Sequence, residues 1–194
     1  MIHENFVIFG AIIFFFGSVG YFLETISGKV KPNRVTWFLW SLAPFIAFFA
    51  QIKQGVGIQA LLTFMIGFIP LMIFIASFVN KKSYWKLEKL DLTCGVISII
   101  GLILWLITKN GNIAILFSLI SDAMAAMPTA IKSLKRPETE NYMLYLTNAV
   151  FAALTLLTIK EWTFNVYSFP LYMLVMTGSI AVFIKFKVGK YIFK

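Results

Sequence analysis

The chain has 194 residues, of which 60% are hydrophobic and only 13% are charged. Soluble domains carry about 25% charged residues, and a water-soluble fold of this length cannot bury so much apolar surface. The composition therefore excludes an ordinary soluble domain, and a formal net charge of +9 on so apolar a chain is typical of a polytopic membrane protein with its charges in loops.

Seven apolar stretches follow one another along the chain, each near the roughly 20 residues that a helix needs to cross a bilayer. They are Phe6–Glu24, Val35–Ile52, Val56–Val79, Leu90–Thr108, Asn112–Ile131, Asn141–Ile159 and Phe164–Ile184. The joins between them are short and carry Gly, Pro, Asn or Lys. We therefore predict an all-α polytopic membrane protein with seven transmembrane helices. The first stretch is expected to be a span rather than a cleaved signal peptide, because no basic segment precedes it.

The basic residues fall mainly on one side of these predicted spans. That side collects Lys29, Lys31, Arg34, Lys81, Lys82, Lys86, Lys89, Lys132, Lys135, Arg136, Lys185, Lys187, Lys190 and Lys194, and the other side has Lys53, Lys109 and Lys160. Lysine and arginine are enriched in cytoplasmic loops, so the C-terminus is predicted to be cytoplasmic and the N-terminus outside. This charge pattern explains the net charge without a nucleic-acid partner, and it fits a bacterial inner membrane.

An internal repeat relates the first three spans to the last three. A shift of 105 residues places Pro32 on Pro137, Trp40 on Tyr145 and Ala47 on Ala152. Three helix boundaries, two basic turns and two prolines after those turns keep this one offset. We interpret the pattern as two copies of a three-span unit.

The repeat constrains the architecture, because a three-span unit ends on the side opposite its start. Two such units are parallel only when an odd number of spans separates them. We therefore predict a 3+1+3 plan with a first triple-helix bundle at 1–80, an inversion linker helix at 81–110 and a second triple-helix bundle at 111–194, which ends in a short basic tail. Parallel repeats of this kind occur in transporters, with the substrate site near the midplane at the repeat interface.

The second repeat also carries a local motif. Pro128-Thr129 is followed by the basic turn Ile131-Lys-Ser-Leu-Lys-Arg136-Pro137 and by Glu140. This arrangement resembles the PQ motif of the SWEET and PQ-loop superfamily of small-solute carriers, with Thr129 in place of the Gln and Leu23-Glu24 at the matching place in the first repeat. The resemblance implies a transport role. Nicotinamide-riboside transporters share the plan, so a vitamin-like solute is one option beside a sugar or an amino acid.

Asp122 is the one acidic residue in the middle of a predicted span. It lies on a stripe of small and polar residues at helical spacing: Ser118, Ser121, Asp122, Ala125 and Thr129. A charge inside a membrane costs about 2.5–3.5 kcal/mol and usually faces protein or water. We expect Asp122 to bind the solute and to couple transport to a proton, with Ser118 and Ser121 beside it, and close helix packing through the small residues is the alternative for the stripe.

Span 6 presents a second polar stripe that includes Tyr145 and Asn148. Asn148 resembles, by its position in the bundle, the Asn that lies near the substrate in SWEET relatives; the alternative is an interhelical hydrogen bond. Trp40 and Tyr145 are candidates for stacking on a solute ring or, with Asp122, for holding a cation. Trp37 and Tyr142, one turn nearer the basic side, are interpreted as an aromatic belt at the membrane interface.

Three further residues are candidates for conformational roles. Pro128 interrupts helical hydrogen bonding and is a predicted hinge. Glu24 and Thr129, at the corresponding places of the two repeats, are predicted gate residues. Glu24 could pair with Lys29 or a loop arginine, and an ordinary interfacial carboxylate is the alternative.

The sequence lacks the usual signatures of catalysis. No phosphate-binding GxxxxGK[ST], no HExxH and no Ser/His arrangement is present, and a single cysteine (Cys94) with a single histidine (His3) excludes a disulfide framework and a cysteine- or histidine-rich metal site. We expect no enzyme, no cofactor and no metal. The favoured function is an alternating-access facilitator or proton-coupled carrier for a small polar solute. A homo-oligomer is compatible with this function. The alternative is a non-transporting membrane receptor or assembly protein.

Overall fold

The computed structural model describes residues 2–80 and 111–192. It also describes eight isolated positions between them: Lys89, Leu92, Thr93, Val96, Ile99, Ile100, Ile103 and Ile107. The fourth predicted span and the predicted linker at 81–110 otherwise lie outside the described residues.

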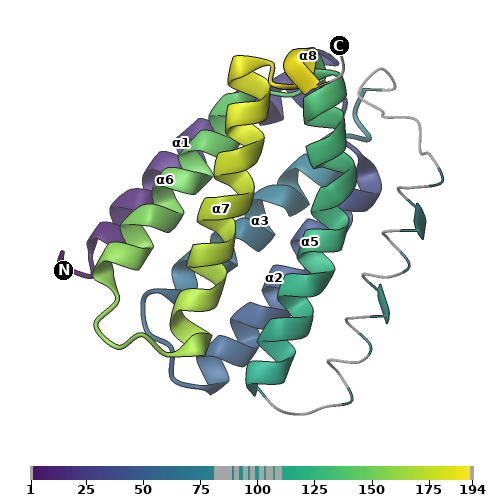
Figure 1. Ribbon diagram of the computed structural model, residues 1–194. Coiled ribbons are helices and arrows are strands. Elements are labelled where there is room, and N and C mark those ends of the chain that lie inside the picture. Colours follow the sequence, from purple (N-terminus) through teal and green to yellow (C-terminus); the bar gives the residue numbers. More distant parts are fainter. Residues whose placement is uncertain are drawn as a thin grey trace.

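The described part of the chain is all-helical (Figure 1). Its long helices are α1 (Phe6–Ser27), α2 (Arg34–Lys53), α3 (Ala60–Ala76), α5 (Gly111–Lys135), α6 (Tyr142–Thr158) and α7 (Phe164–Phe186). A short 3-10 helix, η1 (Pro137–Thr139), joins α5 to α6, and α8 (Gly189–Ile192) follows α7. These bounds lie within a few residues of the six apolar stretches predicted on either side of the undescribed segment.

Local sequence signals explain where several helices begin and end. The side chain of Asn33 accepts hydrogen bonds from the backbone N–H groups of Val35 and Thr36 and so caps α2, and Asn141 caps α6 through Met143 N–H. Gly28 ends α1 in the left-handed region, with φ of 78°, where a residue without Cβ is favoured.

Four of the helices are long and apolar enough to cross a membrane: α1, α2, α5 and α7. The other two, α3 and α6, have 17 residues each, which is the lower limit for a spanning helix. Many large apolar side chains on the outer faces of the helices are exposed, among them Phe16, Phe49 and Val175. Soluble monomers rarely expose so much apolar surface, which marks contact with a membrane or with another protein.

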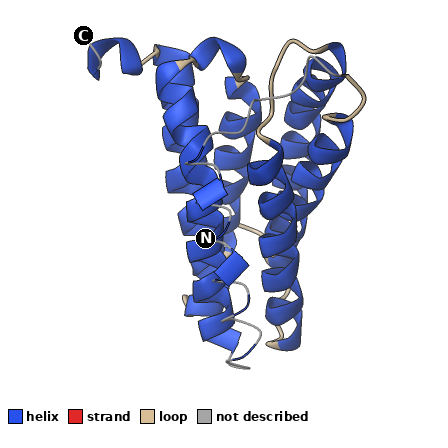
Figure 2. Ribbon diagram, turned by 90° about the vertical axis from the view of Figure 1, so that its right-hand side faces the viewer, coloured by secondary structure: helices blue, strands red, loops and turns tan. Residues whose placement is uncertain are grey.

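The six long helices form two groups that lie side by side (Figure 2). In the first group α3 packs against both α1 and α2, and in the second α7 packs against both α5 and α6. The groups meet where α1 packs on α6 and where α2 packs on α5. Gly10 and Gly17 permit the first of these contacts, because a Cβ at either position would overlap the side chain of Phe151 or Thr147.

Candidate functional site

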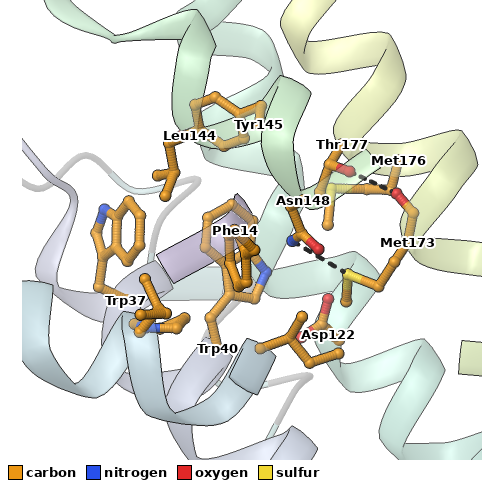
Figure 3. A pocket seen from close by; sticks show the side chains of 13 residues that line it. Phe14, Trp37, Trp40, Asp122, Leu144, Tyr145, Asn148, Met173, Met176 and Thr177 are labelled. Atoms are coloured by element: carbon orange, nitrogen blue, oxygen red, sulfur yellow. Dashed lines mark hydrogen bonds between the residues drawn. The ribbon is translucent and has the colours of Figure 1, made fainter. Parts of the chain in front are cut away.

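A small cavity lies where the two groups meet, and all six long helices contribute to its wall (Figure 3). The lining residues are Phe14, Trp37, Trp40, Ile66, Ile69, Pro70, Asp122, Leu144, Tyr145, Asn148, Met173, Met176 and Thr177. Water-sized molecules can be centred in about 30 Å³ of it, which is room for one or two waters. Most of the wall is apolar, so its few polar groups are prominent.

Asp122 is the one carboxylic acid among the described residues of this wall. Its side chain is fully buried, and its Oδ2 accepts a hydrogen bond from the hydroxyl of Tyr172 on α7 at 2.8 Å. Its Oδ1 has no hydrogen-bond partner among the described residues. The indole N–H of Trp40 interacts with the carboxyl group but falls short of hydrogen-bond geometry. A buried carboxyl with half of its acceptor capacity unused is costly unless a proton or a ligand completes it.

Asn148 faces the same cavity from α6 (Figure 3). Its Nδ2 lies 3.9 Å from the sulfur of Met173, a weak contact, and its Oδ1 has no hydrogen-bond partner among the described residues. An amide oxygen can accept two hydrogen bonds. The side chain therefore offers an unused acceptor to whatever occupies the cavity.

Aromatic rings of Trp37, Trp40 and Tyr145 line the cavity between these polar groups and the basic end of the molecule. The centroids of Trp37 and Trp40 are 5.3 Å apart in an edge-to-face arrangement, and those of Trp40 and Tyr145 are 6.4 Å apart. Trp37 is only 1% exposed, so the interpretation of Trp37 as an interfacial belt residue is wrong. Tyr142 is partly buried at the basic end, with Lys185 Nζ 4.5 Å from its ring centroid.

Above the aromatic rings lies a buried polar cluster, which we call the Glu140 cluster: Tyr21, Lys132, Glu140 and Tyr145. Glu140 Oε2 accepts hydrogen bonds from the hydroxyls of Tyr21 at 2.8 Å and Tyr145 at 3.0 Å. Glu140 Oε1 forms an ion pair with Lys132 Nζ at 2.5 Å, and that ammonium also donates to the carbonyl of Lys31. The cluster therefore joins α1 and the α1–α2 loop to the second group of helices.

The Glu140 cluster was missed by the sequence analysis. Lys132 and Glu140 lie on either side of a turn, and their charges resemble ordinary loop charges until the turn folds them together. Tyr172, the partner of Asp122, was also missed, because it is 50 residues away from Asp122 in the chain and lies in an apolar span. The Tyr at this position carries no spacing signal that points to Asp122.

The predicted site residues divide between the cavity and its surroundings. The structure brings Asp122, Asn148, Trp40 and Tyr145 together on one wall. Ser118 and Ser121 are buried but are not among the lining residues. The hydroxyl of Ser118 donates to the carbonyl of Ala43 on α2 at 2.7 Å, a contact of the helix-packing kind.

The predicted hinge and gate residues lie outside the cavity. The helix α5 continues without a break through Pro128. Thr129 is fully buried, and its hydroxyl has no hydrogen-bond partner among the described residues. Glu24 accepts a hydrogen bond from Asn141 Nδ2 at 2.7 Å, which links α1 to the start of α6.

No protein-family model, curated protein or solved structure matches this chain. The cavity, its unpaired polar atoms and the buried cluster beside it are the features that point to a function.

Proposed function

We propose that this protein is a membrane carrier that moves a small polar solute through the cavity between its two groups of helices. One observation carries the proposal: a cavity lined from six helices contains a buried carboxyl and a buried amide, each with an unused oxygen. Packing alone gives no reason to keep two such acceptors buried at one place, since an unsatisfied polar group costs about 1–3 kcal/mol.

The charge distribution supports a membrane location with the basic end in the cytoplasm. Contacts between helix ends gather Lys31, Lys132 and Lys185 at one end of the molecule. Lys53 is the last residue of α2 and lies near the opposite end, where Gln51 donates to the carbonyl of Asn165. Basic residues collect on the cytoplasmic side of membrane proteins. In the proposal the N-terminus faces outward, and the membrane is the inner membrane of a bacterium.

The pairing of helices supports the proposed parallel repeats. Under the offset of 105 residues, α1, α2 and α3 correspond to α5, α6 and α7. The contact of α1 with α6 then has the contact of α5 with α2 as its counterpart, and both third helices pack on the other two members of their group. This is the pattern expected of two parallel triple-helix bundles, 1–80 and 111–194, and in the proposal a helix within 81–110 inverts the chain between them. We propose that the chain shares this plan with the SWEET and PQ-loop superfamily.

The two copies differ in chemistry, and the difference favours the second copy as the functional one. The offset places Asp122 on Gly17 and its partner Tyr172 on Gly67. It also places Asn148 on Ala43. The carboxyl and amide groups of the cavity therefore come from the second bundle. The first bundle lines it with Phe14, Trp37, Trp40, Ile66, Ile69 and Pro70.

Alternating access requires that the cavity be closed on one side at a time. In the proposal the buried Glu140 cluster and the buried rings of Trp37, Trp40 and Tyr145 form the closure at the basic end. Opening on that side requires Tyr21 and Lys31 to part from Glu140 and Lys132. In the proposal Asp122 carries the coupled proton, because it is the one carboxyl group among the described residues of the wall.

The test is uptake into proteoliposomes by purified protein, after a thermal-shift screen against sugars, amino acids, nucleosides and vitamins. A ligand that binds only the folded state raises its apparent stability. We expect at least one solute to raise the melting temperature and to be taken up in a pH-dependent way, and we expect Asp122→Asn to abolish the pH dependence. Uptake that stays equally pH-dependent in Asp122→Asn contradicts proton coupling through Asp122. If liposomes with the wild-type protein take up no solute faster than empty liposomes, the carrier function is contradicted.

A further inference from the structure

The cavity has an unbalanced charge, and this imbalance indicates what kind of solute it takes. Among the described residues, no lysine or arginine lines the cavity with Asp122 or hydrogen-bonds to its carboxyl group. Tyr172 from α7 hydrogen-bonds to Asp122. The other described residues that line the cavity are Phe14 from α1, Trp37 and Trp40 from α2, Ile66, Ile69 and Pro70 from α3, Leu144, Tyr145 and Asn148 from α6, and Met173, Met176 and Thr177 from α7. The titratable groups among them are the phenols of Tyr145 and Tyr172.

The nearest buried cation on α5, Lys132, already forms an ion pair with another carboxylate. Lys132 lies ten residues after Asp122, about 15 Å along α5, and pairs with Glu140. Asp122 therefore has two ways to avoid a bare buried charge: it holds a proton, or a cationic ligand lies beside it. The Tyr172 hydroxyl binds Oδ2 of this carboxyl group. Its Oδ1, with the indole of Trp40 near the carboxyl group, has an acceptor site available to a ligand.

The rest of the wall suits an organic cation better than a sugar. Trp37, Trp40, Tyr145 and Phe14 surround the cavity with aromatic rings, whose faces attract ammonium groups by cation–π interaction. Met173 and Met176 add polarizable sulfur. A sugar needs several hydrogen-bond partners for its hydroxyls, and this wall offers few. Asn148 Oδ1 supplies an acceptor for an ammonium N–H or a hydroxyl on the same ligand.

We propose that the solute of this cavity is an organic ammonium ion, which binds at Asp122 in exchange for a proton. The balance is simple: the protonated carboxyl releases H⁺ to water as the ammonium ion enters, and the carboxylate and the cation then form a neutral pair. No covalent bond other than O–H changes. The inference rests on the proposed carrier function, and it makes that carrier an exchanger of protons for organic cations.

The size of the cavity adds a conformational requirement. It holds one or two water-sized molecules in this arrangement, so an organic ammonium ion is bound in a wider arrangement of the two groups of helices. Occupancy by such a cation is therefore expected to shift the population toward that wider state.

The test is equilibrium binding in detergent, which needs no transport. Choline is compared with dimethylbutanol, its uncharged carbon analogue, and benzylammonium with benzyl alcohol, by isothermal titration calorimetry. We expect both cations to bind saturably, and each neutral analogue to bind at least about tenfold more weakly. Choline is permanently charged, so its affinity should fall as the pH is lowered, because protons compete for Asp122. Equal binding of a cation and its analogue overturns the inference, and so does the absence of saturable binding of both cations.

A variant and a chemical probe check the location. Asp122→Asn should lose at least tenfold in choline affinity while eluting as a folded protein in gel filtration. A hydrophobic carbodiimide labels buried carboxyl groups, so in the wild-type protein choline should protect Asp122 from labelling, measured by peptide mass spectrometry, and dimethylbutanol should not. Unchanged choline binding in the variant, or labelling that choline does not slow, overturns the inference.

The outcomes separate this inference from the carrier function itself. Choline binding at Asp122 without flux of any solute across liposomes contradicts the carrier and leaves the cation site standing. Flux of a neutral solute by a protein that binds neither cation supports the carrier and overturns the cation site.

Discussion

The hydroxyl of Tyr21 on α1 donates a hydrogen bond of 2.8 Å to Glu140 Oε2, directly after η1 and 119 residues further along the chain. This bond crosses from the first group of helices to the second. The same carboxylate is paired with Lys132, and the side chains of Lys132 and Glu140 are 2% and 0% exposed. A buried network of this kind is stable when all of its contacts are formed or when its members have separated into water. An intermediate arrangement is unfavourable because it leaves buried charges unpaired.

The first prediction concerns Glu140. In Glu140→Gln the ammonium of Lys132 loses its counter-charge inside the protein, and breaking one side of a buried ion pair costs about 3–5 kcal/mol. We expect a fall of this order in the free energy of unfolding, measured in detergent by titration with denaturing surfactant. Glu138→Gln is the matched control, because Glu138 lies in the same turn and is exposed, and it should stay within about 0.5 kcal/mol of the wild type.

A double variant separates the ion pair from the hydrogen bonds. Adding Lys132→Met to Glu140→Gln removes the unpaired charge, so the double variant should be more stable than Glu140→Gln alone. Losses that simply add would show that the pair makes no direct contribution.

The second prediction concerns the contact of α1 with α6. In Gly17→Ala the new Cβ meets the side chain of Thr147, whose own Cβ would lie 2.7 Å away, and overpacking of this kind costs about 1–3 kcal/mol. At Gly20 a Cβ meets nothing within 4 Å, so Gly20→Ala should be neutral or should stabilise the helix by up to about 1 kcal/mol. Thermal unfolding of the two variants side by side is the measurement. Equal effects would contradict the described approach of α1 to α6.

The third prediction separates packing from binding. Ser118→Ala removes the hydrogen bond to the Ala43 carbonyl and should lower stability by about 1 kcal/mol, with solute affinity unchanged. Asn148→Ala removes an acceptor that faces the cavity, and should weaken affinity for the transported solute at least about tenfold with less effect on stability. Concentration-dependent uptake and thermal unfolding of both variants provide the two readouts. A loss of solute affinity in Ser118→Ala would show that Ser118 contributes to solute binding.

Much of the fold could be predicted because apolar stretches and caps are local signals. The start of α2 after Asn33 and the end of α1 at Gly28 follow from residues within one turn of each boundary. The course of the chain within 81–110 lies outside the described residues, so the linker helix stays a prediction. The transmembrane arrangement and the parallel repeats also remain proposals.

The cavity was partly predictable for a different reason. Asp122 and Asn148 were recognised because a polar residue in an apolar span is conspicuous in any sequence. Helical spacing then assigned Ser118 to the same face, although one face of a helix is wide enough to border both a cavity and a neighbouring helix. Trp37 was misplaced because a tryptophan near a helix end is equally compatible with a membrane interface and with a buried contact between helices. Contacts between residues far apart in the chain, such as Tyr172 with Asp122, produce no regular spacing in the sequence from which they could be predicted.

The central claim is that the cavity opens alternately to the two sides of a membrane, and side-specific labelling tests it most directly. Asn148→Cys, made together with Cys94→Ser, is treated with a membrane-impermeant thiol reagent applied either to intact cells or to inside-out vesicles. If the cavity opens alternately, the residue at 148 is labelled from both sides, because each opening exposes the same wall. Labelling from one side alone, or from neither, would contradict alternating access.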